Sequence, residues 1–108
     1  LTGSIGGQTN KVYEVINDYK NVFFITGHLH TGFGKNTYQT IDEANNVQGI
    51  NVPSVGIDNK DGSYNNPGTG LFVEVTPDEV IFYARDFAQG KFLTADQFEQ
   101  AVKVYPLI

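Results

Sequence analysis

The residues best suited to chemistry are the only two histidines of the chain, His28 and His30. They follow an apolar run at residues 22–26 and a single glycine, Gly27. Alternate residues of an extended segment project to the same side, so this spacing predicts two imidazoles aimed at one point just beyond a strand. Neutral imidazole is a common ligand of first-row metals. Two ligands do not close a metal site, so the remaining ligands must come from elsewhere.

The elements before the histidines predict how they are positioned. Thr9 or Asn10 is suited to cap a helix with an apolar stripe at Val12, Val15, Ile16 and Tyr19. Residues 22–26 then lack polar alternation, which is typical of a strand covered on both faces. A helix, a short turn, a buried strand and a loop form the second half of an α/β unit. In open α/β sheets, ligands bind outside the carboxyl ends of the strands, which is where His28 and His30 would lie.

The rest of the chain predicts further strands and a second helix. Strands are expected at residues 38–41, 50–55, 71–75 and 80–87, with a long polar loop at 56–70. The last helix would be capped by Thr94 and Gln97 and would have an apolar stripe at Phe98, Ala101, Val102 and Tyr105, ending at Pro106. We therefore expect an α+β fold in a single domain spanning residues 1–108.

Composition excludes several classes of function. With 7 basic and 12 acidic residues, the formal net charge is −5, and no basic cluster marks a nucleic-acid-binding surface. No apolar run approaches the roughly 18 residues that a membrane span needs. The absence of cysteine excludes thiolate ligands and disulfides. Residues 1–8 are expected to form a Gly-rich loop, and a start at Leu1 suggests a cut from a longer polypeptide.

The neighbours of the histidine pair argue against three known His-x-His sites. A cupin-like oxygenase site has a glutamate four residues after the second histidine, where this chain has Gly34. A lactamase-type zinc hydrolase has an aspartate two residues after it, where this chain has Gly32. A barrel amidohydrolase needs roughly 250 residues of parallel barrel, which exceeds the length of this chain.

The segment Gly27-His28-Leu29-His30, after an apolar strand and before a Gly-rich turn, resembles the last metal-binding motif of calcineurin-like metallophosphoesterases. The segments at 50–55, 70–75 and 80–87, and the phrase Ala84-Arg85-Asp86-Phe87 before Gly90-Lys91-Phe92, are similar to the closing strands of bacterial members of that family. The likeness extends over most of the chain. Only the Gly-His-x-His element is chemically diagnostic.

The resemblance implies a fragment of a four-layer α/β sandwich and a hydrolase of phosphate mono- or diesters with two divalent ions, such as Mn, Fe or Zn. His28 and His30 would each bind a different ion, and such a pair of ions activates a hydroxide for in-line attack. The Asp-x-His, Gly-Asp-x-x-Asp and Gly-Asn-His-Glu/Asp motifs of the family are absent, so no catalytic residue is expected within this chain. The upstream part of the same polypeptide would supply them, and the isolated chain is expected to be inactive.

A second interpretation is a non-catalytic, β-rich binding or accessory domain whose histidines are incidental. Three further groups of residues have types that occur at functional sites. The pair Arg85 and Asp86 is typical of a solvated strand face, and Tyr64 with Asn65-Asn66 would suit a substrate cleft in a long loop. Asp58 and Asp61 lack the spacing and the closing glutamate of a calcium loop, which favours a turn there.

Overall fold

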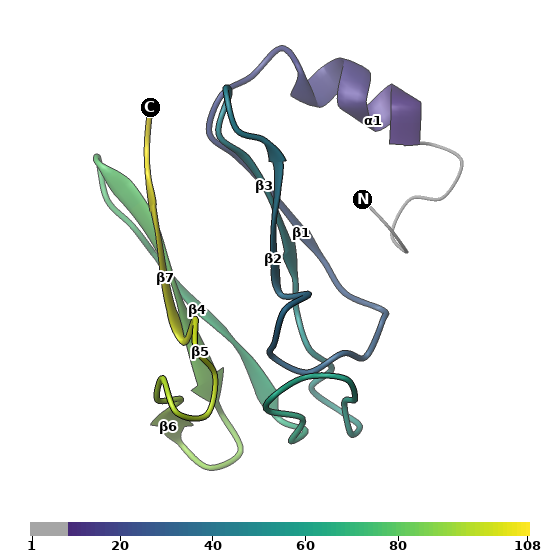
Figure 1. The fold of residues 1–108 in the computed structure, drawn as a ribbon, viewed down its shortest axis with the longest axis vertical. Helices are drawn as coiled ribbons and strands as arrows, with labels where there is room; N and C mark the ends of the chain where they lie inside the picture. The colour runs from purple at the N-terminus through teal and green to yellow at the C-terminus, as the bar shows by residue number, and fades with distance from the viewer. Residues whose placement is uncertain (1–8) are drawn as a thin grey trace.

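Two β-sheets pack face to face in the computed structural model, which describes residues 9–108 (Figure 1). The described residues form one helix and seven strands: α1 (Thr9–Ile16), β1 (Val22–Thr26), β2 (Tyr38–Asp42), β3 (Val47–Asn51), β4 (Thr69–Val75), β5 (Glu79–Asp86), β6 (Lys91–Phe92) and β7 (Val102–Pro106). The predicted N-terminal loop at residues 1–8 lies outside the described residues. In the described residues the helix thus comes first, and all the later elements are strands.

The first sheet has three strands in the order β1-β3-β2. β1 and β3 are parallel and in register from Val22 opposite Val47 to Thr26 opposite Asn51. β2 returns antiparallel to β3, with Tyr38 opposite Ile50. Because parallel strands end at the same edge, the carboxyl ends of β1 and β3 lie side by side, and the loop that carries the histidines begins there.

The second sheet is antiparallel and is built around β5. β4 pairs with one side of β5 along its whole length, while β6 and β7 share the other side. β5 alternates between the two faces of the sheet: Val80, Phe82 and Ala84 are buried toward the first sheet. This alternation is typical of a strand with one face on the core.

An aromatic core joins the two sheets. Phe23 and Tyr38 of the first sheet contact Phe82 and Tyr105 of the second, with ring centroids 5.3 to 6.3 Å apart. Ile50 is buried in the same cluster. Each such side chain removed from water contributes roughly 1.5–3 kcal/mol, so this cluster is the main stabilising contact between the sheets.

The predicted C-terminal helix is wrong, and with it the α+β fold class. One half of the capping box forms, because Thr94 N–H donates to the Gln97 side chain at 2.9 Å, and Phe98 N–H closes a single turn by donating to the Thr94 carbonyl at 3.0 Å. The turn does not continue as a helix, since residues 102–106 form β7 antiparallel to β5. Its apolar residues also fit a period of two, and β-branched and aromatic residues favour strands.

Over residues 9–108 the protein is therefore mostly β, with one short helix, and is not the helix-flanked metallophosphoesterase fragment expected from the sequence. The helix that does form ends at Ile16, which is buried, while Val15 and Tyr19 of the predicted stripe are exposed. β1 is not covered on both faces either, because Ile25 is 55% exposed. Within residues 9–108, no helix has the length and apolar character to cross a membrane.

Candidate functional site

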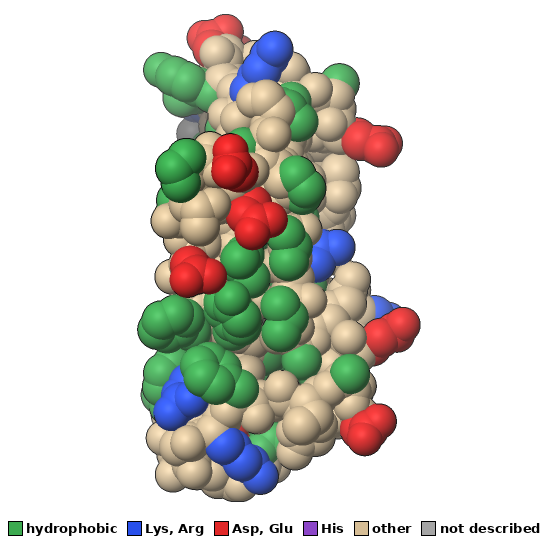
Figure 2. Space-filling view, turned by 90° about the vertical axis from the view of Figure 1, so that its left-hand side faces the viewer, with side chains coloured by type: hydrophobic (Ala, Val, Ile, Leu, Met, Phe, Trp, Pro, Cys, Tyr) green, Lys and Arg blue, Asp and Glu red, His purple; other side chains and the backbone are tan. Residues whose placement is uncertain are grey.

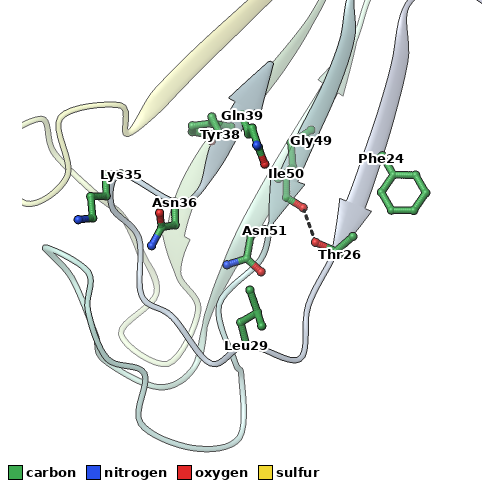
Figure 3. Close-up of a pocket in the computed structure, with 10 residues that line it drawn as sticks. All are labelled: Phe24, Thr26, Leu29, Lys35, Asn36, Tyr38, Gln39, Gly49, Ile50 and Asn51. Atoms are coloured by element: carbon green, nitrogen blue, oxygen red, sulfur yellow. Dashed lines mark hydrogen bonds between the residues drawn. The ribbon is translucent and has the colours of Figure 1, made fainter. Parts of the chain in front are cut away.

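His28 and His30 lie in the loop that leaves the carboxyl end of β1 (Figure 3 shows this end of the sheet). Thr26, the last residue of β1, is opposite Asn51, the last residue of β3. The Val52 N–H donates to the Thr26 carbonyl at 2.8 Å, which extends the pairing of the two chains past the strand ends. The expectation that the histidines follow the carboxyl end of a parallel strand is confirmed.

The backbone at both histidines is left-handed, with φ of 78° at His28 and 54° at His30. The segment is therefore not extended, and the alternation rule used on the sequence does not apply to it. The two imidazoles still lie near each other, with ring centroids 6.5 Å apart, and both residues are exposed. Positive φ outside glycine costs free energy, and such residues cluster at functional sites.

The long loop at residues 56–68 holds the second histidine in place. The Lys60 N–H donates to the His30 carbonyl at 3.0 Å, and the Gly32 N–H donates to the Lys60 carbonyl at 3.0 Å. The following Phe33 is fully buried and stacks on Phe98 with ring centroids 5.2 Å apart. The loop after β1 is thus fixed at its far end by an aromatic anchor and along its length by backbone hydrogen bonds.

A pocket of about 480 Å³ opens beside this loop. Its lining comes from all three strands of the first sheet and from the loop between β1 and β2. The lining residues are Phe24, Thr26, Leu29, Lys35, Asn36, Tyr38, Gln39, Gly49, Ile50 and Asn51. Leu29, the residue between the histidines, forms part of the wall. Lys35 is the one charged residue in this lining, and in Figure 3 its side chain extends away from the other labelled residues, while the amide side chains of Asn36, Gln39 and Asn51 supply polar groups.

Asn51 is a functional candidate that the sequence did not reveal. Its amide nitrogen donates to the Thr31 hydroxyl at 2.5 Å, while its side-chain oxygen is buried and has no hydrogen-bond partner among the described residues. Buried polar atoms are nearly always paired, so an unpaired amide oxygen at the pocket calls for an explanation. The predicted strand at 50–55 placed Asn51 inside a strand, whereas it ends one.

The two residues Arg85 and Asp86 do not form a solvated pair. Asp86 is fully buried and accepts hydrogen bonds from the Tyr64 hydroxyl at 2.5 Å and from the Gln89 N–H at 2.9 Å. The hydrogen bond from Tyr64 is the main reason that the pKa of Asp86 is lowered from its ordinary value. The same bond raises the pKa of Tyr64.

The predicted cleft role of Tyr64 and the two asparagines after it is not supported by their contacts. The Asn65 side chain closes a turn by accepting from the Gly62 N–H at 2.9 Å and donating to the Gly62 carbonyl at 3.0 Å. The Asn66 side chain donates to the Tyr64 hydroxyl at 3.1 Å. The two asparagine side chains are used within the loop and the Tyr64 hydroxyl binds Asp86 of β5, and none of the three residues lines the pocket beside the histidines.

The imidazoles of His28 and His30 are exposed, with ring centroids 6.5 Å apart. Two imidazoles on one tetrahedral zinc ion have ring centres about 5 Å apart, a separation that a change of rotamer at either exposed side chain is enough to reach. Among residues 9–108, no three His, Cys, Asp or Glu side chains come together as a metal-binding group. The described part of the chain therefore brings together only the predicted pair.

Comparison with protein-family models, with curated proteins and with solved structures finds no match to this chain in any of the three.

Proposed function

We propose that this chain contributes His28 and His30 to the binuclear metal centre of a phosphoesterase, each histidine binding a different divalent ion. The observation that carries the proposal is the position of the pair. Both residues follow the carboxyl end of a parallel strand, both have positive φ, and their rings are 6.5 Å apart. The resemblance of Gly27-His28-Leu29-His30 to the last metal-binding motif of calcineurin-like metallophosphoesterases supports this reading.

The bound ions would polarise the phosphoryl group and lower the pKa of a bound water, with Mn, Fe or Zn as the candidates. The remaining ligands would come from the upstream part of the same polypeptide, because the sequence has no third histidine. The residues of this chain would hold the ions and position the substrate. Lys35 in the pocket wall is suited to attract a phosphate oxygen, since a lysine ammonium acts as a point charge for phosphate.

The proposal is tested on the polypeptide that includes the region upstream of Leu1. Hydrolysis of p-nitrophenyl phosphate and bis-p-nitrophenyl phosphate is measured with Mn²⁺ for the unaltered protein, His28→Ala, His30→Ala and the double variant. Loss of a ligand should lower kcat/KM by at least about 100-fold, because even the outer partners of metal ligands are worth 10- to 100-fold.

Gln39→Ala is the matched control, because Gln39 lines the pocket but lacks a metal-binding imidazole. It should keep metal-dependent activity within a fewfold of the unaltered protein. Full activity in the double histidine variant would contradict the proposal and favour a non-catalytic binding or accessory domain. A gene product in which no Asp-x-His or Gly-Asn-His motif lies upstream of Leu1 would contradict it too.

A further inference from the structure

The outer face of the second sheet carries an apolar surface that we name the aromatic face. Strand register places its six residues on one side of the sheet, away from the first sheet: Phe72, Ile81, Tyr83, Phe92, Val102 and Val104. Four of them are 44 to 56% exposed, although they are large and hydrophobic. They form a continuous green area in Figure 2. Contiguous exposed apolar patches of this kind mark interaction sites.

The aromatic rings of this face contact one another within a single copy of the chain. Phe72, Tyr83 and Phe92 form a triangle with centroid separations of 5.9 to 6.1 Å and edge-to-face angles. The Arg85 guanidinium lies 4.4 Å from the centroid of Phe92. Aromatic residues and arginine are the types that dominate binding energy at protein interfaces, and fixed side chains lose little entropy on binding.

Charge is distributed unevenly along the same face. Glu79 and Arg85 belong to the same face of β5, because they are six positions apart, an even number. A strand rises about 3.4 Å per residue, so they lie about 20 Å apart along it. Glu74 adds a second carboxylate at the Glu79 end. In Figure 2 acidic side chains border the apolar area toward the β4–β5 turn, and basic side chains border it toward β6.

This pattern is complementary to itself. A two-fold axis through the middle of β5 would bring Glu79 of one copy opposite Arg85 of the other, and the reverse, with the apolar residues between them. Two-fold homodimers use the same patch on both subunits, as this arrangement requires. We propose that the aromatic face is the interface of a homodimer, in which the second sheets of two copies pack face to face with their β5 strands antiparallel.

The state of association of the chain itself tests this proposal, without metal or substrate. Sedimentation velocity between about 5 and 200 µM should show a concentration-dependent dimer, as for dissociation constants in the micromolar range. Phe92→Ser should weaken dimerisation at least about 30-fold, because it removes a large aromatic side chain from both copies of the interface. Ile57→Ser is the matched control, because Ile57 is 53% exposed but lies in the long loop, outside the aromatic face.

A charge exchange tests the orientation of the two copies. Glu79→Arg and Arg85→Glu each place like charges opposite one another and should each shift the protein to monomer. In an equimolar mixture of the two variants, the heterodimer recovers both complementary contacts, so the mixture should dimerise more tightly than either variant alone. A monomer at the highest concentration, or a dimer that Phe92→Ser and Ile57→Ser affect equally, would overturn the proposal. Neither result would bear on the metal site, which is on the other sheet.

Discussion

The Tyr64 hydroxyl donates a 2.5 Å hydrogen bond to the buried carboxylate of Asp86, which joins the long loop to the end of β5. The residues are 22 positions apart in the sequence. The loop that contains Tyr64 also clamps the His30 backbone through Lys60. The bond therefore helps to fix the loop against which the candidate site is built.

Removing this hydrogen bond should destabilise the protein in a pH-dependent way. The pKa of Asp86 is lowered in the folded protein, chiefly by the bond from Tyr64, so its contribution is present above the ordinary pKa of about 3.9. The contribution is lost as the pH falls through the folded pKa. Tyr64→Phe should lower the free energy of unfolding in urea by about 1–3 kcal/mol at pH 7 and by less in acid.

Tyr83→Phe is the control for that experiment, since the Tyr83 hydroxyl bonds an exposed carboxylate, that of Glu74, at 3.1 Å. Its effect on unfolding should stay within about 0.5 kcal/mol at pH 7. If Tyr64→Phe lowers the free energy of unfolding by the same amount at pH 7 and in acid, the role assigned to the ionised Asp86 is contradicted.

Two other tyrosines should behave in the opposite way. The hydroxyls of Tyr38 and Tyr105 are buried and have no hydrogen-bond partner among the described residues. Burial raises the pKa of both, that of Tyr105 to about 12. Replacing an unpaired buried hydroxyl by hydrogen removes a desolvation cost, so Tyr38→Phe and Tyr105→Phe should leave stability unchanged or raise it by up to about 1 kcal/mol. A loss as large as that of Tyr64→Phe in urea unfolding would refute this.

The long loop at residues 56–68 approaches the loop between β1 and β2 so closely that position 62 must be glycine. A Cβ on Gly62 would lie 2.6 Å from the Gly32 carbonyl carbon and 2.7 Å from the Phe33 carbonyl oxygen, both backbone atoms. Gly62→Ala should therefore cost about 1–3 kcal/mol in thermal or urea unfolding. Gly56→Ala, where a Cβ has nothing within 4 Å, should change stability by no more than about 0.5 kcal/mol. Equal effects of the two substitutions would disprove the close approach.

Because the backbone at His28 is left-handed, a glycine variant at this position should be more stable than an alanine variant, the reverse of the usual order. At φ of 78° a Cβ is strained, so His28→Gly should be more stable than His28→Ala by about 1 kcal/mol. At the neighbouring Leu29, which is not among the residues with positive φ, the glycine variant should be the less stable by about 0.5–1 kcal/mol. Calorimetric melting of the four variants checks the inversion, and the same order at both positions would contradict it.

The sequence predicted the strands that carry strong local signals. Residues 22–26 form β1 with the predicted bounds, and the predicted pair at 71–75 and 80–87 corresponds to β4 and β5. Residues 102–106 were misassigned because their apolar positions fit both the helical and the strand period, and pairing with β5 decides between them.

The environment of the candidate site depends on contacts that are distant in sequence. The buried Asp86 accepts a hydrogen bond from Tyr64, 22 positions away, and the unpaired oxygen of Asn51 lies where β3 ends. No pattern in the sequence predicts positive φ at two histidines, because the residue types that most often adopt it are glycine and asparagine. The position of the pair at a strand end was predictable, and its backbone conformation was not.

Calorimetric titration of Mn²⁺ or Zn²⁺ into the polypeptide that includes the region upstream of Leu1 tests the central claim most directly. Two ions per chain should bind, and His28→Ala and His30→Ala should each weaken a different one of the two binding events. The isolated chain should bind metal only weakly, because it supplies one histidine to each ion where an ion needs about four ligands. Loss of the same single event in both variants would show one shared ion, and unchanged binding in the double variant would remove these histidines from the site.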